Sequence, residues 1–146
     1  MPILAQIESD YEQAYKARKQ GEVSTLRLLL AALKNERINK MAELEEMDII
    51  NVLKRELKKR KESIEEYEKG NRMDLATREK EEVITLERYL PVQLTEDEIR
   101  VKVREVLKAE TEPINSGKLI GKVMAALQGM ADGNTVRKLV EEETKK

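Results

Sequence analysis

The stretch YLPVQLTEDE, residues 89–98, divides a strongly helical sequence into two groups of predicted helices. Pro91 disfavours helical backbone at the residue before it, so the preceding helix is predicted to end here. Thr95 and Glu98 then have the spacing of a capping box, which opens a new helix. We therefore expect one domain over residues 1–91 and a second over residues 92–146.

Before this boundary, apolar residues recur with helical periodicity in successive segments joined by short links. Gly21 is predicted to stop the first helix, and Gly70-Asn71 is a typical helix-ending pair for the third. Short links favour antiparallel neighbours. The apolar stripes, of which the first includes Tyr11 and Tyr15, lie within residues 4–15, 26–41, 50–67 and 75–90.

After the boundary, the pattern predicts three shorter helices. The first carries Ile99 and Leu107 on one face, the second begins at Ser116, and Asp132 is placed to cap the third. Strand patterns are nearly missing. The sequence thus predicts an all-α fold, with an N-terminal antiparallel domain of about four helices and a small C-terminal three-helix domain.

Composition excludes several kinds of chemistry. The chain has no Cys and no His, which rules out cysteine zinc sites and histidine-dependent nucleophilic catalysis. Acidic neighbours such as Glu81-Glu82 are expected to be solvated, so we assign no catalytic residue, metal ligand or cofactor. The N-terminal MPILAQIESDYEQ is not a signal peptide, and no apolar run reaches the roughly 20 residues of a membrane span. We expect a cytoplasmic protein without a membrane partner.

A basic run, KRELKKRK, occupies residues 54–61. On a helix its basic residues flank an apolar stripe, and Lys61 has a matching acid at Glu65, four residues on. Two interpretations stay open: a solvated helix face, which is the commoner case, or a secondary patch that contacts phosphate. The patch would consist of Lys54, Arg55, Lys58, Lys59 and Lys61.

Four of the six glycines lie in SGKLIGKVMAALQGMADG, residues 116–133. Gly117, Gly129 and Gly133 fall at predicted helix ends, and Gly129 suits a left-handed helix-ending position. Gly121 lies inside a helix, where glycine costs about 1 kcal/mol relative to alanine. Its missing Cβ would let another backbone come close, either a neighbouring helix or a sugar-phosphate chain.

The charge around these glycines favours an anionic partner. Between residues 116 and 140 there are four basic residues against one acid, a local excess of +3, although the whole chain carries −1. Free N–H groups at the two helix starts add partial positive charge that suits phosphate. Aromatic residues make up only 3% of the chain, so we expect recognition of folded RNA by backbone and shape rather than by base stacking.

The sequence also resembles a known family. The matching segments are TLRLLLAALKNERI (25–38), KRKESIEEYEKGNRMDLATREKEEVITLERYLPVQL (59–94), GKVM (121–124) and ADG (131–133). Together, in this order, they are similar to the GatB/YqeY family, and in particular to its short free-standing YqeY branch. The resemblance implies a C-terminal domain like the tail of GatB, the tRNA-holding part of a tRNA-dependent amidotransferase subunit.

The resemblance implies the activity of a carbon–nitrogen ligase with glutamine as amido-N donor. It also implies tRNA and an amidotransferase or another translation-related protein as partners. No amide-activating nucleophile or phosphoryl-transfer site can be placed in this chain. By position, the tail motif corresponds to Gly121, Lys122, Met124, Ala131, Asp132 and Gly133.

Family members often carry basic residues where this chain has Gln128 and Met130, so two phosphate contacts are missing and whether RNA is bound stays open. Three hypotheses follow: a non-catalytic tRNA-binding accessory, an enzyme with the family activity, and a helical protein–protein adaptor without nucleic-acid binding. The predicted RNA-binding residues are Lys118, Gly121, Lys122, Asp132, Gly133, Arg137 and Lys138.

Overall fold

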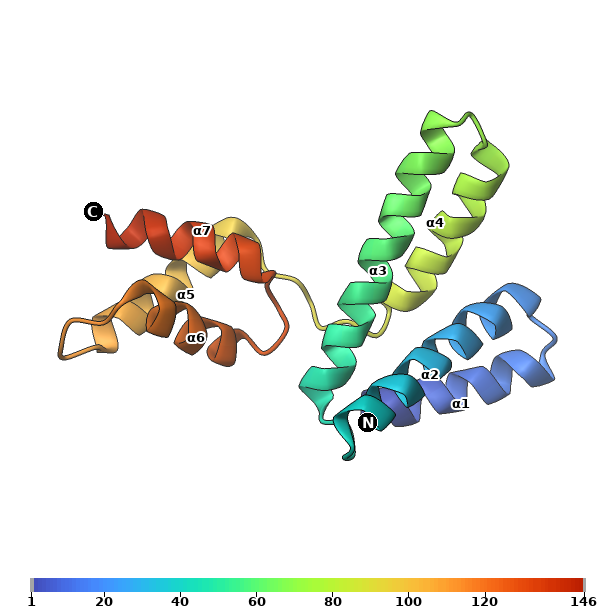
Figure 1. Cartoon of the computed structure of the whole chain (residues 1–146), viewed down its shortest axis with the longest axis horizontal. Helices are drawn as coiled ribbons and strands as arrows, with labels where there is room; N and C mark the ends of the chain where they lie inside the picture. The colour runs from blue at the N-terminus through green and yellow to red at the C-terminus, as the bar shows by residue number, and fades with distance from the viewer. Residues whose placement is uncertain (1, 146) are drawn as a thin grey trace. The chain divides into compact units, whose positions relative to one another are not determined.

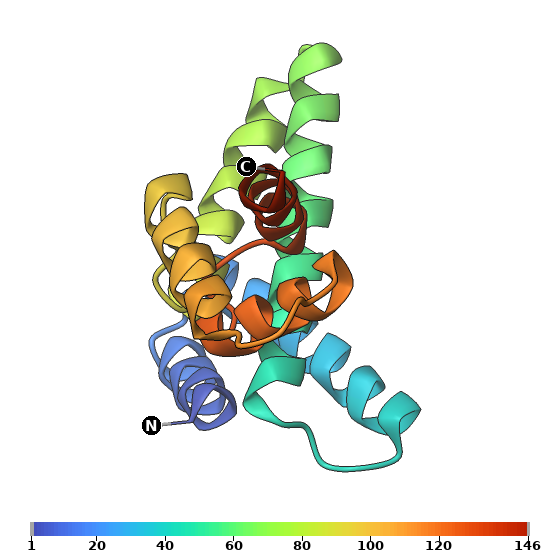
Figure 2. The same cartoon turned by 90° about the vertical axis from the view of Figure 1, so that its left-hand side faces the viewer.

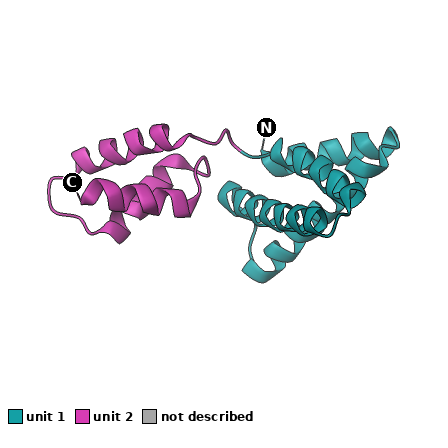
Figure 3. Cartoon of the chain, turned by 90° about the horizontal axis from the view of Figure 1, so that it is seen from above, with its two compact units in different colours: residues 1–90 teal, residues 91–146 magenta. Residues whose placement is uncertain are grey.

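The computed structural model describes residues 2–145, and every regular element within this range is an α-helix. The predicted all-α fold is therefore confirmed for the described residues. The chain forms two compact units, residues 1–90 and residues 91–146, coloured separately in Figure 3. Over residues 2–145, no helix is both long enough and apolar enough to cross a bilayer.

The N-terminal unit contains four helices: α1 (Ile3–Lys16), α2 (Gln20–Lys40), α3 (Glu46–Lys69) and α4 (Met73–Glu87). Helices α3 and α4 form a long hairpin and lie side by side in both views (Figures 1 and 2). Helices α1 and α2 form a second hairpin. The two hairpins pack through one core that includes Ile7, Leu26, Leu53 and Leu86, each at most 1% exposed.

One turn of this unit differs from the sequence-based expectation, and another agrees with it. Gly21 does not end α1, because it lies in the first turn of α2. The chain instead reverses at Arg18, which has a left-handed φ of 57°, while the Lys19 N–H donates to the Ala14 carbonyl at 3.0 Å. The predicted helix end at Gly70-Asn71 is confirmed, because α3 ends at Lys69 and Asn71 has a left-handed φ of 58°.

The C-terminal unit contains α5 (Glu96–Ala109), α6 (Ser116–Leu127) and α7 (Gly133–Thr144). The predicted capping box is confirmed, because the Glu98 N–H donates to the Thr95 hydroxyl at 3.2 Å and the Glu98 carboxylate accepts from the Thr95 N–H. Asp132 caps α7 as predicted, accepting from the Thr135 N–H at 3.2 Å. The core is formed by the apolar faces of the three helices, with Ile99, Val103, Leu119, Val123, Leu127, Val136, Leu139 and Val140 buried.

A tight turn ends α6 and fixes the start of this unit. Gly129 has a left-handed φ of 84°, as predicted. Gln128, the residue before it, is also left-handed, with φ of 41°. The Gln93 amide donates to the Gly129 carbonyl at 2.9 Å, and the Leu94 N–H donates to the Met130 carbonyl at 2.8 Å. The segment before α5 is thereby attached to the α6–α7 turn.

Candidate nucleic-acid interface

The outward face of α6 is open. Gly117, Lys118, Gly121 and Lys122 are all exposed, while Leu119 and Val123 from the same helix are fully buried. An added Cβ at Gly121 would meet nothing within 4 Å. No helix of this unit packs on Gly121 within the described structure, so the helix-packing explanation for this glycine is wrong inside the unit. The glycine leaves main chain accessible from outside.

The predicted basic residues do not converge on one point. Lys122 forms an ion pair with Glu110, just after the end of α5, whereas the Lys138 amino group lies 3.5 Å from Glu96 at its start. These two acids are 14 residues apart, which corresponds to roughly 21 Å along a helix. Within residues 2–145, Lys118 and Arg137 form no ion pair. The seven predicted RNA-binding residues are therefore distributed along α6, the cap of α7 and α7 itself.

The starts of α6 and α7 differ in the charge of their caps. The neutral side chain of Asn115 caps α6, accepting from the Lys118 N–H at 2.8 Å. Sequence reasoning missed this cap, although Asn is a preferred capping residue and stands just before Ser116. At α7 the cap is the Asp132 carboxylate, whose negative charge opposes an incoming phosphate. Of the two starts, α6 is better suited to hold an anion.

Glu143 fixes α7 against α5. Its side chain is 6% exposed and accepts two hydrogen bonds from the Arg104 guanidinium, at 3.1 and 3.2 Å. Arg100 lies 3.6 Å from the same carboxylate and also pairs with Glu142 at 3.1 Å. The hydrogen bonds that Arg104 donates to the Glu143 carboxylate raise the pKa of Arg104 above its ordinary value. Because these arginines are already engaged, they are not available to a ligand in the way that Arg137 is.

Most cations of the basic run on α3 pair with acids, either on α3 itself or on the helices packed against it. Arg55 lies 3.0 Å from Glu36 of α2, and Lys59 lies 3.7 Å from Glu56. Lys61 pairs with Glu87 of α4 at 3.5 Å rather than with Glu65 as its spacing suggested. Of the remaining two residues of the predicted patch, Lys58 is exposed and Lys54 is partly buried. This arrangement favours a solvated helix face held by cross-helix pairs.

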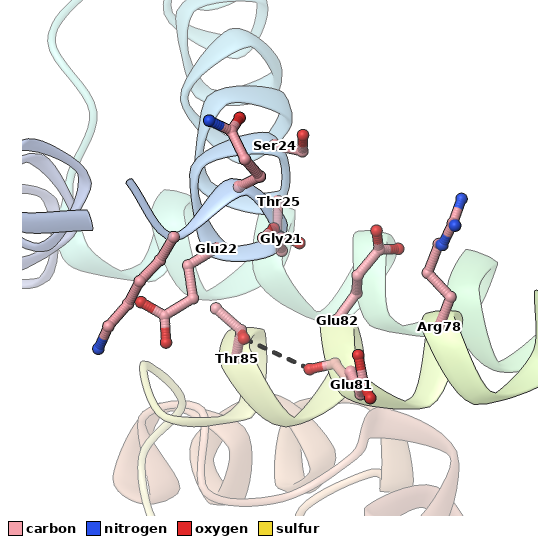
Figure 4. Close-up of a pocket in the computed structure, with 10 residues that line it drawn as sticks. Gly21, Glu22, Ser24, Thr25, Arg78, Glu81, Glu82 and Thr85 are labelled. Atoms are coloured by element: carbon pink, nitrogen blue, oxygen red, sulfur yellow. Dashed lines mark hydrogen bonds between the residues drawn. The ribbon is translucent and has the colours of Figure 1, made fainter. Parts of the chain in front are cut away.

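A groove of about 660 Å³ lies between the start of α2 and α4 (Figure 4). Its acids do not form a catalytic pair, because Glu82 contacts Arg60 of α3 while Glu81 is exposed. Burial raises the pKa of the Glu82 carboxyl, and the positive charge of Arg60 acts in the opposite direction. Among residues 2–145, no group of three or more acids could hold a metal ion.

One surface was missed by sequence reasoning. Tyr15, expected in the apolar stripe of the first helix, is 63% exposed. Its ring centroid lies 6.3 Å from that of Tyr11, and the Tyr11 hydroxyl accepts a hydrogen bond from Arg27 Nε at 3.4 Å. The spacing of the tyrosines, four residues apart on a helix, was the available signal.

Fold and surface together define a class: an all-α protein of two small units, with an open, basic, glycine-containing helix face in the second. Residues 4–144 match the family described as Yqey-like protein. Since the match covers nearly the whole chain, the protein belongs to the Yqey-like family, as the quoted motifs indicated.

Three relatives are fungal proteins. An uncharacterized protein of Schizosaccharomyces pombe is 32% identical over 61% of this chain and 72% of its own length. The protein named altered inheritance of mitochondria protein 41, mitochondrial, is 34% identical in Lachancea thermotolerans, over 71% of this chain and 57% of the relative. In Kluyveromyces lactis the protein of that name is 32% identical, over 82% of this chain and 68% of the relative.

These names correct the expectation of a cytoplasmic protein. That expectation was wrong because it rested on the missing signal peptide and membrane span, which say nothing about organelles, whereas the named relatives are mitochondrial proteins. The chain spans between 57% and 72% of the lengths of the relatives described above. The activities of those longer proteins therefore do not transfer directly.

Proposed function

We propose that this Yqey-like protein is a non-catalytic accessory that binds tRNA through the outward face of its C-terminal unit. The observation that carries the proposal is the open surface over Gly121, where an added Cβ would meet no atom within 4 Å. Lys118 and Lys122 lie on the same exposed helix face. Together they offer close backbone approach and positive charge, as a sugar-phosphate chain requires.

Recognition by shape is the mode that suits this unit. All four aromatic residues lie at or before residue 89, so residues 91–146 contain no ring on which a base could stack. The unit can instead bind phosphate through its lysine and arginine side chains and through the free N–H groups at the start of α6. A folded RNA presenting a regular backbone is the matching ligand class.

Association with a tRNA-dependent amidotransferase is the second part of the proposal. It is supported by the likeness of residues 121–124 and 131–133 to the tail motif of GatB. In this role the protein would hold tRNA, and the amidotransferase would supply the ligase chemistry. The reaction needs no catalytic residue from this chain.

Gly121→Leu tests the first part directly. The position is exposed and unobstructed, so the variant should fold, yet its side chain would keep an RNA backbone away from α6. We expect at least a several-fold loss of affinity for unfractionated tRNA. The matched control is Gly21→Leu, because Gly21 is also exposed, helical and without atoms within 4 Å of an added Cβ.

A charge variant completes the test. Lys118→Gln with Lys122→Gln should flatten the dependence of log affinity on log salt by about 0.9 unit for each lost phosphate contact. Unchanged tRNA affinity in both Gly121→Leu and the lysine variant would reject the proposal. Co-purification of the chain with an amidotransferase in the presence of tRNA tests the second part.

One observation favours the adaptor alternative. Ile38 and Met41, at the end of α2, are 58% and 90% exposed, and such neighbouring apolar side chains are typical of protein-contact sites. The adaptor hypothesis expects Ile38→Glu with Met41→Glu to release a protein partner while tRNA affinity stays unchanged. A stable protein partner together with no measurable RNA binding would favour it over the tRNA proposal.

A further inference from the structure

A second candidate site lies on the N-terminal unit, where α1 and α2 meet at their connecting turn. Two adjoining grooves of about 340 and 500 Å³ share Tyr15 and Arg27 in their walls. Together they are lined by three basic residues against the single acid Glu12. We call this the tyrosine–arginine surface, and its residues are Tyr11, Glu12, Tyr15, Lys16, Arg18, Gln20, Val23 and Arg27.

The cations of this surface are uncompensated, unlike most others in the unit. Within residues 2–145, Lys16, Arg18 and Arg27 form no ion pair. Elsewhere in the N-terminal unit, many of the described basic residues pair with acids. They are Arg37, Lys40, Arg55, Lys59, Arg60, Lys61, Arg72, Lys80 and Arg88. A local positive charge without partners therefore remains at the α1–α2 turn.

Tyr11 and Tyr15 form the aromatic part of this surface. Tyr11 and Tyr15 are one turn apart on α1, with their ring planes inclined by 40° and their centroids 6.3 Å apart. Tyr15 is 63% exposed, so much of its ring is accessible to solvent. An exposed ring between unpaired cations is the arrangement that proteins use to stack a nucleic-acid base and hold the flanking phosphates.

Arg27 is positioned without being neutralised. Its Nε–H donates to the Tyr11 hydroxyl at 3.4 Å, which orients the guanidinium and leaves its terminal NH₂ groups available. A guanidinium with both terminal nitrogens available can hold a phosphate through two parallel hydrogen bonds. Arg18, in a left-handed conformation with φ of 57°, carries a second cation at the tip of the hairpin.

We propose that the tyrosine–arginine surface binds a short run of unpaired RNA nucleotides, with a base stacked on Tyr15 and phosphates held by Arg18 and Arg27. An acidic protein segment could satisfy the cations, but it would leave the exposed ring unused. This site is independent of α6: it takes single strands by stacking, whereas the C-terminal unit is proposed to take folded RNA by its backbone.

The test measures binding of the full chain to a fluorescent single-stranded RNA of about 10 nucleotides, a length within the usual site size. Tyr15→Leu keeps an apolar side chain but removes the ring, and we expect a loss of affinity of roughly 5- to 100-fold. Tyr15→Phe keeps the ring and should bind as the unmodified protein does. Because the residue is exposed, both variants should fold.

The charge contribution is tested with a matched pair on α2. Arg27→Gln should weaken binding and lower the salt slope by about 0.7, the value for one phosphate contact to a single strand. Lys34→Gln makes the same change of charge at another exposed residue that has no ion pair within residues 2–145, and should leave affinity nearly unchanged. Equal losses in the two variants would mean that only general charge matters, and would overturn the proposal.

Two further outcomes decide between ligand classes and between sites. The proposal fails if Tyr15→Leu binds the RNA normally, or if polyglutamate displaces the RNA as well as unlabelled RNA does. The tRNA proposal for α6 is judged separately, by the effect of Gly121→Leu on tRNA affinity. If Tyr15→Leu no longer binds single-stranded RNA while Gly121→Leu binds tRNA normally, the proposal for the tyrosine–arginine surface stands and the tRNA proposal for α6 is rejected.

Discussion

The Tyr89 hydroxyl donates a 2.6 Å hydrogen bond to a carboxylate oxygen of Asp10, joining the last residues of the N-terminal unit to its first helix. Tyr89 is 7% exposed, so this polar contact closes the edge of an apolar core. Burial, followed by the bond to Asp10, raises the pKa of Tyr89 well above its usual range. The neutral phenol is therefore the form that the fold requires.

Tyr89→Phe should remove this hydrogen bond and lower the free energy of unfolding by about 1–3 kcal/mol at neutral pH. A raised pKa means that the contribution is complete below the ordinary tyrosine pKa of about 10 and is lost as the pH rises above it. Urea unfolding at neutral and alkaline pH should show the difference between the two proteins shrinking. Tyr67→Phe is the control, and an equal effect there would contradict the prediction.

Arg60→Met should make stability depend on pH through Glu82. The Arg60 side chain is 11% exposed and lies between Glu79, at 3.4 Å, and Glu82. Without the guanidinium, burial raises the pKa of Glu82 further. Ionising this carboxyl then costs free energy in the folded state, so the free energy of unfolding falls as the pH rises from about 4 to 7. We expect a loss of about 2 kcal/mol near neutral pH and a smaller loss in acid.

The same experiment on Arg60→Met with Glu82→Gln provides the check. With no carboxyl at position 82, the pH dependence over this range should largely disappear in thermal unfolding. A pH dependence that persists in the double variant would assign the effect to Glu79 or to another acid, contrary to the prediction.

Two glycines near each other in sequence should respond oppositely to alanine. Gly121 is exposed, helical and unobstructed, so Gly121→Ala should stabilise the C-terminal unit by about 0.5–1 kcal/mol. Gly129 is buried with φ of 84°, and Gly129→Ala should cost about 1–2 kcal/mol. Calorimetry of both variants measures the two shifts, and the same sign for both would refute this account.

Neutralising Glu143 should weaken the attachment of α7 to α5. Glu143→Gln retains shape but loses the charged hydrogen bonds to Arg104, and we expect the melting temperature to fall by several degrees. Glu142→Gln removes an exposed partner of Arg100 and should change it little. Circular dichroism melts of the two variants measure this difference. Equal falls in the two melting midpoints would contradict the prediction.

The helical fold and the caps of α5 and α7 were readable from the sequence because they depend on local chemistry. The side chains of Thr95 and Asp132 bond to N–H groups three residues away, so the residue types and their spacing suffice. The α1–α2 turn was not readable in this way. Glycine is the residue type that most often adopts the left-handed conformation at a turn, which pointed to Gly21. In the structure Arg18 adopts that conformation instead.

The candidate surfaces depended on tertiary contacts that spacing alone does not specify. Lys61 could reach Glu65 on its own helix, but the hairpin brings Glu87 to it. Similarly, helical periodicity assigned Tyr15 to the apolar face, whereas the hairpin buries Ala14 and leaves Tyr15 in solvent. Which face of a helix is covered depends on its neighbours, and this is why the tyrosine–arginine surface emerges only from the structure.

The bonds from Gln93 and Leu94 to the α6–α7 turn determine where the second unit can be severed from the first. A recombinant fragment beginning at Pro91 keeps both anchoring residues, whereas one beginning at Thr95 discards them and leaves the Met130 carbonyl without its donor. Protein engineers who want the C-terminal unit alone should therefore place the cut, or any affinity tag, ahead of Pro91.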